Sequence, residues 1–325
     1  MTWLAWRQLR APVLSVYPVL VLVCAALALG RPDGGAPTDL DPWYRGGLFA
    51  VWVLPVALGV FWGVPLITRE LGAGTHHLVW NQSVTRTRWL AVKLGLGVPA
   101  AAVAAGALGL AVTWWSGPLD ATAPDPGSGF APRVTPLVFA ARGVAPLGYA
   151  AFAFVLGVAV AIALRRTVPA MAVTLLLYAA VQVAVPLVVR PHLLPPTDEV
   201  VAITERTVAG VRVNGDVPEA LQVLAPPGAW VLTNETVDRD GARVHPLPDA
   251  VRHCVPRVPP EGFDRSVVDR MHACFAGLGD LGYRQHLVHH PATHFWPVQW
   301  SELALFLALC APVTWFCFHR LRDLA

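Results

Sequence analysis

The stretch GVAPLGYAAFAFVLGVAVAIALRRTVPAMAVTLLLYAAVQVAVPLVV, residues 143–189, decides the fold of this chain. It consists of two apolar runs, Gly143–Leu164 and Thr167–Val189, separated only by Arg165 and Arg166. Each run has the roughly 20 residues that a helix needs to cross the hydrocarbon core of a bilayer. A helix is expected because lipid offers no partner to backbone amides and carbonyls. The stretch therefore predicts a tight antiparallel pair of membrane helices.

Four more runs of similar length and hydrophobicity occur in the chain. They are approximately Ala11–Gly30, Gly46–Thr68, Leu90–Trp115 and Trp296–Phe318. Of the 325 residues, 55% are hydrophobic and 14% are charged, whereas a soluble domain carries about 25% charged residues. We therefore predict an α-helical polytopic membrane protein with six transmembrane helices. A cleaved signal peptide is the alternative for the first run, although that run is longer than a usual signal h-region.

The placement of the arginines predicts the orientation. They flank the first run on its N-terminal side, lie between runs two and three and between runs four and five, and follow the sixth run, whereas the other connections mix arginine with aspartate. Because cytoplasmic loops carry an excess of basic residues, we expect both termini in the cytoplasm. The predicted order is a cytoplasmic interfacial segment (1–10), helices one to five (11–189), an extracellular domain (190–295), and a sixth helix with a short cytoplasmic tail (296–325).

The segment 190–295 is predicted to form a small α+β domain. Val200–Val213 is rich in β-branched residues and ends at the turn signal Asn214-Gly215. Ala229–Thr233 is a second strand candidate, and Asp264–Gly277 has apolar residues at helical spacing.

Two groups of residues in this domain bear on its chemistry. Cys254 and Cys274 would form a disulfide in an oxidising compartment, and two unpaired thiols are the alternative. A histidine run follows, made of His286, His289, His290 and His294. Its spacing, HxxHHxxxH, matches no closed tetrahedral zinc pattern. We expect a polar surface there, with no metal and no cofactor.

Several classes of function are excluded because the sequence lacks the residues that they need. Lys93 is the only lysine, and its neighbours are Val92 and Leu94, so the chain has no Gly-Lys-Ser/Thr phosphate loop. The spans carry essentially one carboxylate, Glu302, whereas ion-coupled transporters and intramembrane proteases place ionisable residues at depth. We expect Glu302 to make an interfacial polar contact, with substrate contact as the alternative. The net charge of +3 is too small to predict nucleic-acid binding. The chain is therefore not expected to be an enzyme, and any energy must come from a partner.

The segment RELGAGTHHLVWNQSVTRTRWLAVK, residues 69–93, connects runs two and three. Apolar residues alternate in it with polar and basic ones, as in a short helix that packs into a groove of a partner. The alternative is an interfacial loop whose arginines only obey the positive-inside rule.

This segment resembles the first cytoplasmic loop of the type-2 ABC exporter permeases, in the version common in actinobacteria. There the loop runs Glu-x-x-x-Gly-Thr-x-x-Leu, then a Gln/Ser-Val-x-Arg stretch, then Trp and Lys. The matching residues are Glu70, Gly74, Thr75, Leu78, Gln82, Ser83, Val84, Arg86, Trp89 and Lys93. Residues 1–10, 142–171 and 289–306 resemble further parts of the family. The family usually reads Tyr-Gln-Pro-Ala-Ser-Arg where this chain has His289, His290, Thr293 and His294.

The resemblance implies the permease half of an ATP-driven exporter in a bacterial plasma membrane, paired with a second permease (a homodimer) and docked on separate ABC-type ATPase subunits. Residues 69–89 would be the coupling loop, through which ATP drives alternating access. The implied coupling residues are Glu70, Gly74, Thr75, His76, Leu78, Val79, Gln82 and Arg86. Spans two and five would line an apolar cavity for an amphipathic or hydrophobic substrate. The implied cavity residues are Phe49, Trp52, Phe61, Leu175, Tyr178 and Gln182. A non-transporting membrane sensor or assembly protein with a ligand-binding extracellular domain is the alternative.

Overall fold

The computed structural model describes residues 2–31, 41–72, 85–122, 131–214, 217–254 and 265–322. The chain divides into two compact units. Met1–Leu194 and Thr293–Ala325 form a helical bundle, and Pro195–Ala292 form a strand-containing unit inserted between the fifth and sixth long helices.

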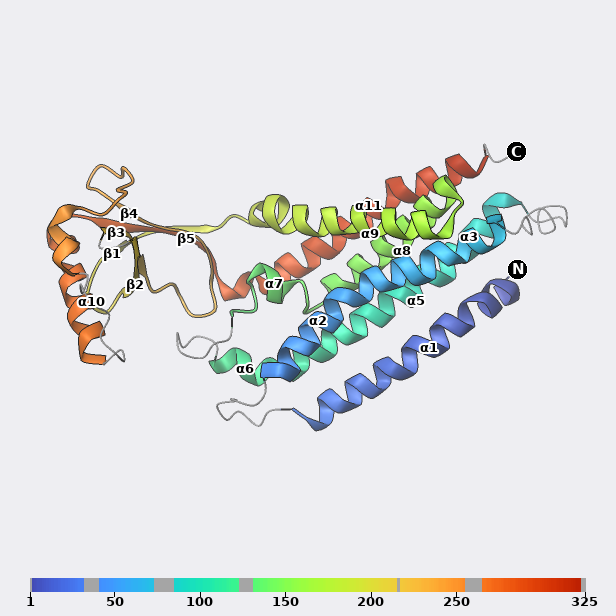
Figure 1. Ribbon diagram of the computed structural model, residues 1–325, viewed down its shortest axis with the longest axis horizontal. Coiled ribbons are helices and arrows are strands. Elements are labelled where there is room, and N and C mark those ends of the chain that lie inside the picture. The colour runs from blue at the N-terminus through green and yellow to red at the C-terminus, as the bar shows by residue number, and fades with distance from the viewer. Residues whose placement is uncertain are drawn as a thin grey trace. The chain divides into compact units, whose positions relative to one another are not determined.

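The bundle contains six helices that are long and apolar enough to cross a membrane, which confirms the predicted number (Figure 1). The second span is continuous through a π-helical segment, and the fifth passes through another into a final 3-10 turn. The elements are α1 (Thr2–Leu29), α2 (Asp41–Leu58), η1 (Gly59–Gly63), α3 (Val64–Gly72), α5 (Arg86–Trp115), α6 (Gly117–Thr122), α7 (Pro136–Phe139), α8 (Ala145–Leu164), α9 (Thr167–Ala184), η2 (Val185–Val189), η3 (Arg190–His192), η5 (Ala292–His294) and α11 (Phe295–Arg322). Helix α1 begins and α11 ends at the same end of the bundle (Figure 1).

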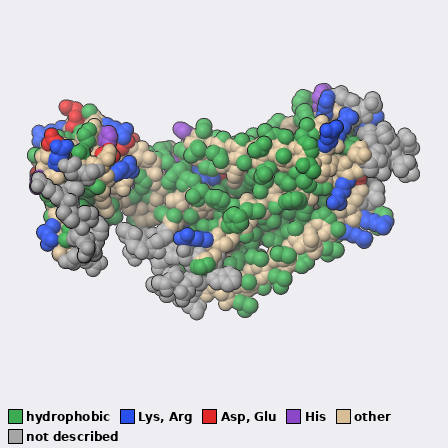
Figure 2. Space-filling view, in the orientation of Figure 1, with side chains coloured by type: hydrophobic (Ala, Val, Ile, Leu, Met, Phe, Trp, Pro, Cys, Tyr) green, Lys and Arg blue, Asp and Glu red, His purple; other side chains and the backbone are tan. Residues whose placement is uncertain are grey.

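The surface of the bundle is that of a protein solvated by lipid. Hydrophobic side chains cover its middle, and basic side chains, which are arginines, gather at the end where α11 terminates (Figure 2). Large apolar side chains are exposed on the surface of the bundle. Among them, Leu176 in α9 is 68% exposed and Leu187 in η2 is 70% exposed. Exposed surface of this kind is stable in hydrocarbon and costly in water.

Helix α8 is the central helix of the bundle. It contacts α2, α3, α5, α9 and α11, and most of its residues are buried. The chain leaves α8 at Arg165, which has a left-handed backbone with φ of 58°. Helix α9 begins at Thr167 and packs back on α8. The predicted antiparallel pair with a two-arginine turn is therefore confirmed.

Small residues bring the second span and α8 into backbone contact. A Cβ atom on Gly157 would lie 2.4 Å from the carbonyl oxygen of Gly59, and one on Gly59 would lie 2.5 Å from the carbonyl oxygen of Ala153. Membrane helices associate largely through van der Waals packing, which small residues allow at close range. Glycine at these positions therefore sets the separation of the two helices.

The bundle buries four charged side chains within its described part: Lys93, Arg142, Arg190 and Glu302. All four are paired. Lys93 Nζ lies 2.8 Å from Glu70, Arg142 pairs with Asp120, and Arg190 Nε lies 2.8 Å from Glu302 Oε2.

Glu302 differs from the interfacial contact expected of it, because its side chain is only 1% exposed. Its carboxylate accepts hydrogen bonds from Arg190 Nε and a terminal guanidinium nitrogen, both at 2.8 Å, and from the Tyr149 hydroxyl at 2.6 Å. Arg190 ends the fifth span and Glu302 lies in the sixth, so the pair ties together the two helices that frame the strand-containing unit.

The strand-containing unit has two small antiparallel sheets. One has the order β1-β5-β4, and the other is the hairpin β2-β3. Its elements are β1 (Thr197–Ala202), β2 (Val208–Asn214), β3 (Val217–Val223), β4 (Trp230–Val237), η4 (Asp249–Cys254), α10 (Arg265–Asp280) and β5 (Arg284–His290). Leu221, Phe275 and Leu278 are fully buried in its core. A disulfide joins Cys254 in η4 to Cys274 in α10.

The predicted strands are partly correct. Asn214, the last residue of β2, pairs with Val217, the first residue of β3, and the predicted Asn214-Gly215 turn lies partly outside the described residues. The single strand expected over Val200–Val213 is divided between β1 and β2. Strand β5 was not predicted, and it contains His286, His289 and His290, of which the last two are buried rather than exposed.

Replacing Gly157 with alanine should lower the unfolding temperature of the purified protein, because the new methyl group would have to displace the carbonyl of Gly59. Overpacking of this kind costs about 1–3 kcal/mol. Gly95 in α5 is the matched control, since nothing lies within 4 Å of the position of its Cβ. Gly95→Ala should leave the unfolding temperature unchanged or slightly raised. Equal unfolding temperatures for the two variants would contradict the close packing described above.

Glu302→Ala leaves Arg190 buried without its counter-ion, and breaking such a pair costs about 3–5 kcal/mol. We expect a marked fall in the unfolding temperature measured in detergent. The double variant Arg190→Met, Glu302→Leu removes both charges and should recover part of the loss. If Glu302→Ala unfolds at the wild-type temperature, the pair does not hold the helices together.

Candidate functional site

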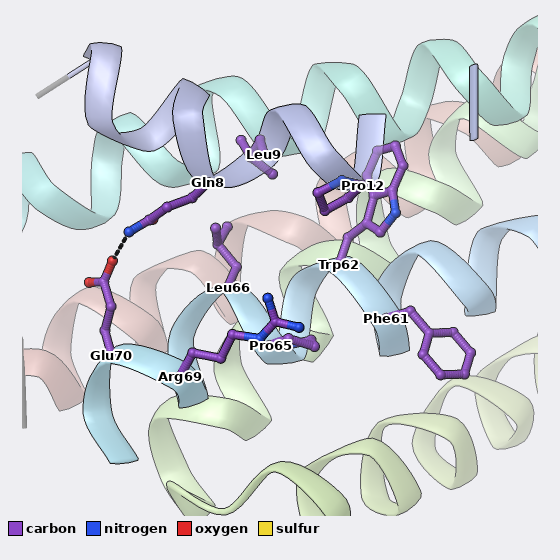
Figure 3. A pocket seen from close by; sticks show the side chains of 9 residues that line it. All are labelled: Gln8, Leu9, Pro12, Phe61, Trp62, Pro65, Leu66, Arg69 and Glu70. Carbon is purple, nitrogen blue, oxygen red and sulfur yellow. Dashed lines mark hydrogen bonds between the residues drawn. The ribbon is translucent and has the colours of Figure 1, made fainter. Parts of the chain in front are cut away.

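Glu70 joins α3 to α5 near the neighbouring ends of the two helices. This residue lies in the last turn of α3, two residues before the end of that helix. Its carboxylate accepts hydrogen bonds from Trp89 Nε1 at 2.8 Å and from Gln8 Nε2, and it pairs with Lys93 (Figure 3 shows the bond to Gln8). Helices α1, α3 and α5 therefore meet at one carboxylate.

Lys93 completes this arrangement, which we call the Glu70 cluster (Gln8, Glu70, Trp89 and Lys93). Its ammonium donates to the carbonyl of Leu66 at 2.8 Å and lies 4.5 Å from the centre of the Trp89 ring. Lys93 is only 2% exposed. An ammonium at this depth is stable only when it is paired and hydrogen-bonded, so the single lysine of the chain has a structural role.

Of the predicted coupling residues, the structure describes two. Glu70 belongs to the cluster above and is largely turned inward, with 12% of its side chain exposed. Arg86 begins α5 and donates to the carbonyl of Arg322 at 3.4 Å. The other predicted residues, Gly74, Thr75, His76, Leu78, Val79 and Gln82, lie outside the described residues.

A cavity of about 310 Å³ lies between the second span, α7 and the fifth span. It is lined by Trp52, Pro136, Leu137, Ala140, Gln182, Val183, Pro186 and Leu187. The lining is mostly apolar. Its polar group is the Gln182 side chain, whose buried Oε1 has no hydrogen-bond partner among the described residues. A ligand that fits here would be apolar and would carry a hydrogen-bond donor for this oxygen.

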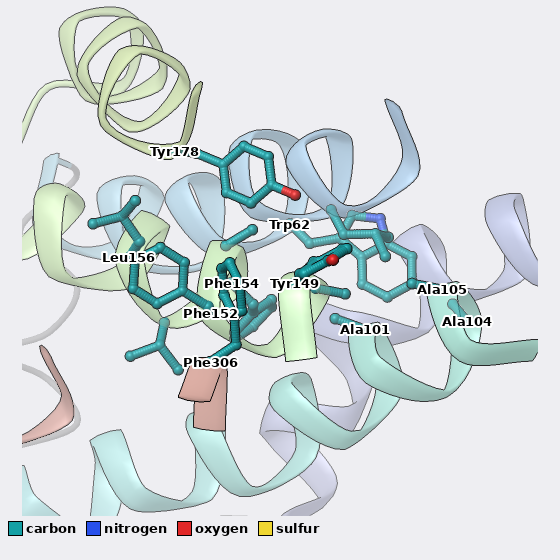
Figure 4. Packing of buried hydrophobic residues seen from close by; sticks show 14 of the residues in the cluster. Trp62, Ala101, Ala104, Ala105, Tyr149, Phe152, Phe154, Leu156, Tyr178 and Phe306 are labelled. Carbon is teal, nitrogen blue, oxygen red and sulfur yellow. The ribbon is translucent and has the colours of Figure 1, made fainter. Parts of the chain in front are cut away.

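The structure brings two of the six predicted cavity residues, Trp52 and Gln182, into this cavity. Phe49 is 66% and Leu175 is 48% exposed on the surface of the chain. The other two lie elsewhere. Tyr178 is buried in the core and reaches toward Trp62, and Phe61 lines a second cavity beside the Glu70 cluster (Figure 4 and Figure 3).

The short helix α7 closes one side of the cavity and is held by side chains of three spans. Its carbonyl oxygens accept hydrogen bonds from Trp52 (to Leu137, 3.1 Å), Arg190 (to Pro136, 3.0 Å) and Gln299 (to Phe139, 3.0 Å). Irregular backbone within a membrane protein is tolerated where protein groups satisfy it in this way. The cavity wall is therefore part of the bundle.

Gln299 makes a second contact, which explains why residue 143 is a glycine. Its Oε1 accepts a hydrogen bond from the backbone N–H of Ala145 at 2.8 Å, at the start of α8. Gly143 has φ of 68°, and a Cβ atom there would lie 2.5 Å from Gln299 Oε1. Glycine is required at this position by both its backbone conformation and the space available.

Sequence reasoning missed Arg190 as a partner of Glu302, and Asp120 as the partner of Arg142. Arg190 follows the fifth apolar run directly and was assigned to the outer domain. A signal existed, because a carboxylate within a span requires a cation, and Arg190 lies at the end of the neighbouring span. Nothing in the sequence identifies that cation among the other arginines at span ends.

Residues 35–190 match the family model described as ABC-2 membrane transporter related. This range includes the Glu70 cluster except Gln8 and every residue that lines the apolar cavity. A search of curated proteins and a search of solved structures found no match.

The family match confirms the resemblance to the type-2 permeases and supports an ABC transporter permease rather than an enzyme. Permeases of this family generally work with an ABC ATPase, and the bacterial cell membrane is their usual setting. The chain is thus a multi-pass membrane protein that carries an ABC-2 membrane transporter related domain, as an ABC-2 type permease does.

Proposed function

We propose that this chain is the transmembrane subunit of an ATP-driven exporter, in which two copies work by alternating access on separate ATPase subunits. Both termini and the connection between α3 and α5 face the cytoplasm in this proposal. The concentration of arginine and lysine at that end of the bundle supports this orientation. The strand-containing unit then lies outside, where its disulfide is stable.

The observation that carries the proposal is the Glu70 cluster at the base of the predicted coupling loop. Glu70, at the start of the predicted loop and in α3, and Lys93, just after the loop and in α5, form a buried ion pair. A push from an ATPase on the loop would therefore move α3 and α5 together instead of bending their ends. Gln8 extends the cluster to α1, so three helices would follow the same movement.

The second span offers a route from the loop to the cavity. Helix α3 continues through η1 into α2, which carries Trp52 at the cavity wall. The π-helical η1 has a different hydrogen-bond pattern from the helices on either side, and such segments are frequent at functional sites. We propose that the loop and the cavity communicate through this span.

The substrate in this proposal is amphipathic or hydrophobic. The cavity is apolar apart from Gln182, and the exposed apolar side chains of α2 and α9, such as Phe49 and Leu176, would face a second copy across a shared cavity. A membrane sensor or assembly protein with a ligand-binding outer domain remains the alternative from another class, and it needs no ATPase.

Leu78→Asp should abolish the binding of an ABC ATPase to this chain, because a buried carboxylate without a partner would replace an apolar contact at the docking surface. The measurement is co-purification after co-expression with the ABC ATPase subunits of the source genome, beginning with any encoded next to this chain. The unfolding temperature of the variant should stay at the wild-type value.

Leu281→Asp is the matched control, since Leu281 is 52% exposed in the strand-containing unit and far from the loop in sequence. This variant should bind the ATPase as the wild type does. Failure of every ATPase to bind the wild-type chain would favour the sensor alternative, and unchanged binding by Leu78→Asp would remove the loop from the proposal.

A further inference from the structure

A second cavity, of about 140 Å³, lies between α1 and the second span (Figure 3). It is lined by Gln8, Leu9, Pro12, Phe61, Trp62, Pro65, Leu66, Arg69 and Glu70. A water molecule takes about 30 Å³ of liquid volume, so the cavity has room for several heavy atoms of a ligand.

The polar end of this cavity contains the guanidinium group of Arg69, which is not paired with any described residue. Arg69 is exposed, and within the described part of the chain its guanidinium makes no hydrogen bond or ion pair. Its neighbour Glu70 is already engaged by Lys93 and Trp89. Guanidinium groups bind phosphate strongly through parallel hydrogen bonds. Arg69 is therefore able to bind an anion at the cavity rim.

The same end of the cavity also contains a hydrogen-bond acceptor, the side-chain oxygen of Gln8, that receives no hydrogen bond from the described residues. Gln8 Nε2 donates to Glu70, and this fixes the amide so that its Oε1 points elsewhere. That oxygen is buried and has no hydrogen-bond partner among the residues that the structure describes. Pro12, one turn further along α1, has no N–H to donate to the backbone carbonyl of Gln8. A buried acceptor without a donor is costly, so a ligand with a hydroxyl or ammonium group would be stabilised here.

The other end of the cavity is apolar. Leu9 and Pro12 line it from α1, and Phe61 lines it from η1. Arg69 lies eight residues after Phe61, or about 12 Å along a helix at 1.5 Å per residue. Arg69 is near the end of the second span and Gln8 near the start of the first, which places the polar end at headgroup depth and the apolar end within the acyl region.

We propose that this cavity binds a glycerophospholipid whose headgroup carries a hydrogen-bond donor. The phosphate lies on Arg69, the hydroxyl or ammonium of the headgroup donates to Gln8 Oε1, and one acyl chain follows Leu9, Pro12 and Phe61. Basic pockets between membrane helices are known sites for lipid headgroups. The lipid would stabilise the packing of α1 on the second span. The proposal depends on the chain lying in a membrane and not on its transport function.

The test is lipid binding to the delipidated, full-length protein in detergent, measured by native mass spectrometry and by the shift in unfolding temperature. Three lipids with identical acyl chains are compared: phosphatidylethanolamine, phosphatidylglycerol and phosphatidylcholine. The first two carry headgroup donors, and choline carries none. We expect the first two to bind and to raise the unfolding temperature, and phosphatidylcholine to bind about tenfold more weakly, as the loss of one hydrogen bond to a buried acceptor predicts.

Arg69→Ala should weaken the binding of both donor lipids by about tenfold or more, because the phosphate loses a charged partner. Arg88→Ala is the matched control, since Arg88 is an exposed arginine in the first turn of α5 at the same end of the bundle. It should bind lipid as the wild type does. Phe61→Ala tests the apolar end separately and should also weaken binding.

Equal binding of the three lipids would overturn the proposed donor contact. If Arg69→Ala and Arg88→Ala lose lipid binding equally, the attraction between cations and headgroups is general, and the proposed site is overturned. If Arg69→Ala does not fold, the site stands or falls on Phe61→Ala and on the comparison of the three lipids with the wild-type protein.

Discussion

The structure depends on one constraint, which is that a charge buried among membrane helices must find its partner within the protein. Lipid supplies neither counter-ion nor hydrogen bond. The described bundle buries Lys93, Arg142, Arg190 and Glu302, and each is paired with a residue of another element. These pairs connect segments that are far apart in sequence, and they hold the bundle at both of its ends.

Between these ends, the bundle is organised around α8. The glycines of α8 and the second span allow backbone contact, so these two helices form a closely packed pair. At one end of the second span, Glu70 links α3 to α1 and α5. At the other, Trp52 hydrogen-bonds α7 at the wall of the apolar cavity. The same span thus connects the two places where we propose function.

Hydropathy and turn chemistry were sufficient to predict the six spans and the Arg165-Arg166 turn, because each depends on neighbouring residues. Strand β5 was missed because its buried histidines look polar in the sequence. The pair of Arg190 and Glu302 spans 112 positions, and only the fold reveals which arginine serves the carboxylate.

The candidate cavity was predicted only in part for a related reason. Lipid-facing and cavity-facing apolar residues have the same composition, so the sequence assigned Phe49, Phe61 and Trp52 to one cavity. The structure separates them: Trp52 and Phe61 line different cavities, and Phe49 lies on the surface. Each cavity also has a buried polar atom without a partner among the described residues, Gln182 Oε1 in one and Gln8 Oε1 in the other, and such atoms are visible only in the folded chain.

The most direct test is the accessibility of a single cysteine at position 182, in vesicles that contain this chain and the ABC ATPase proposed to drive it. Cys24, Cys310 and Cys317 are free thiols and are first replaced. The account predicts that a membrane-impermeant thiol reagent outside the vesicle labels Gln182→Cys faster when ATP hydrolysis is trapped than without nucleotide. Labelling of Val103→Cys, at an exposed position on α5, should not change. Equal labelling rates of Gln182→Cys with and without ATP would contradict an alternating-access permease.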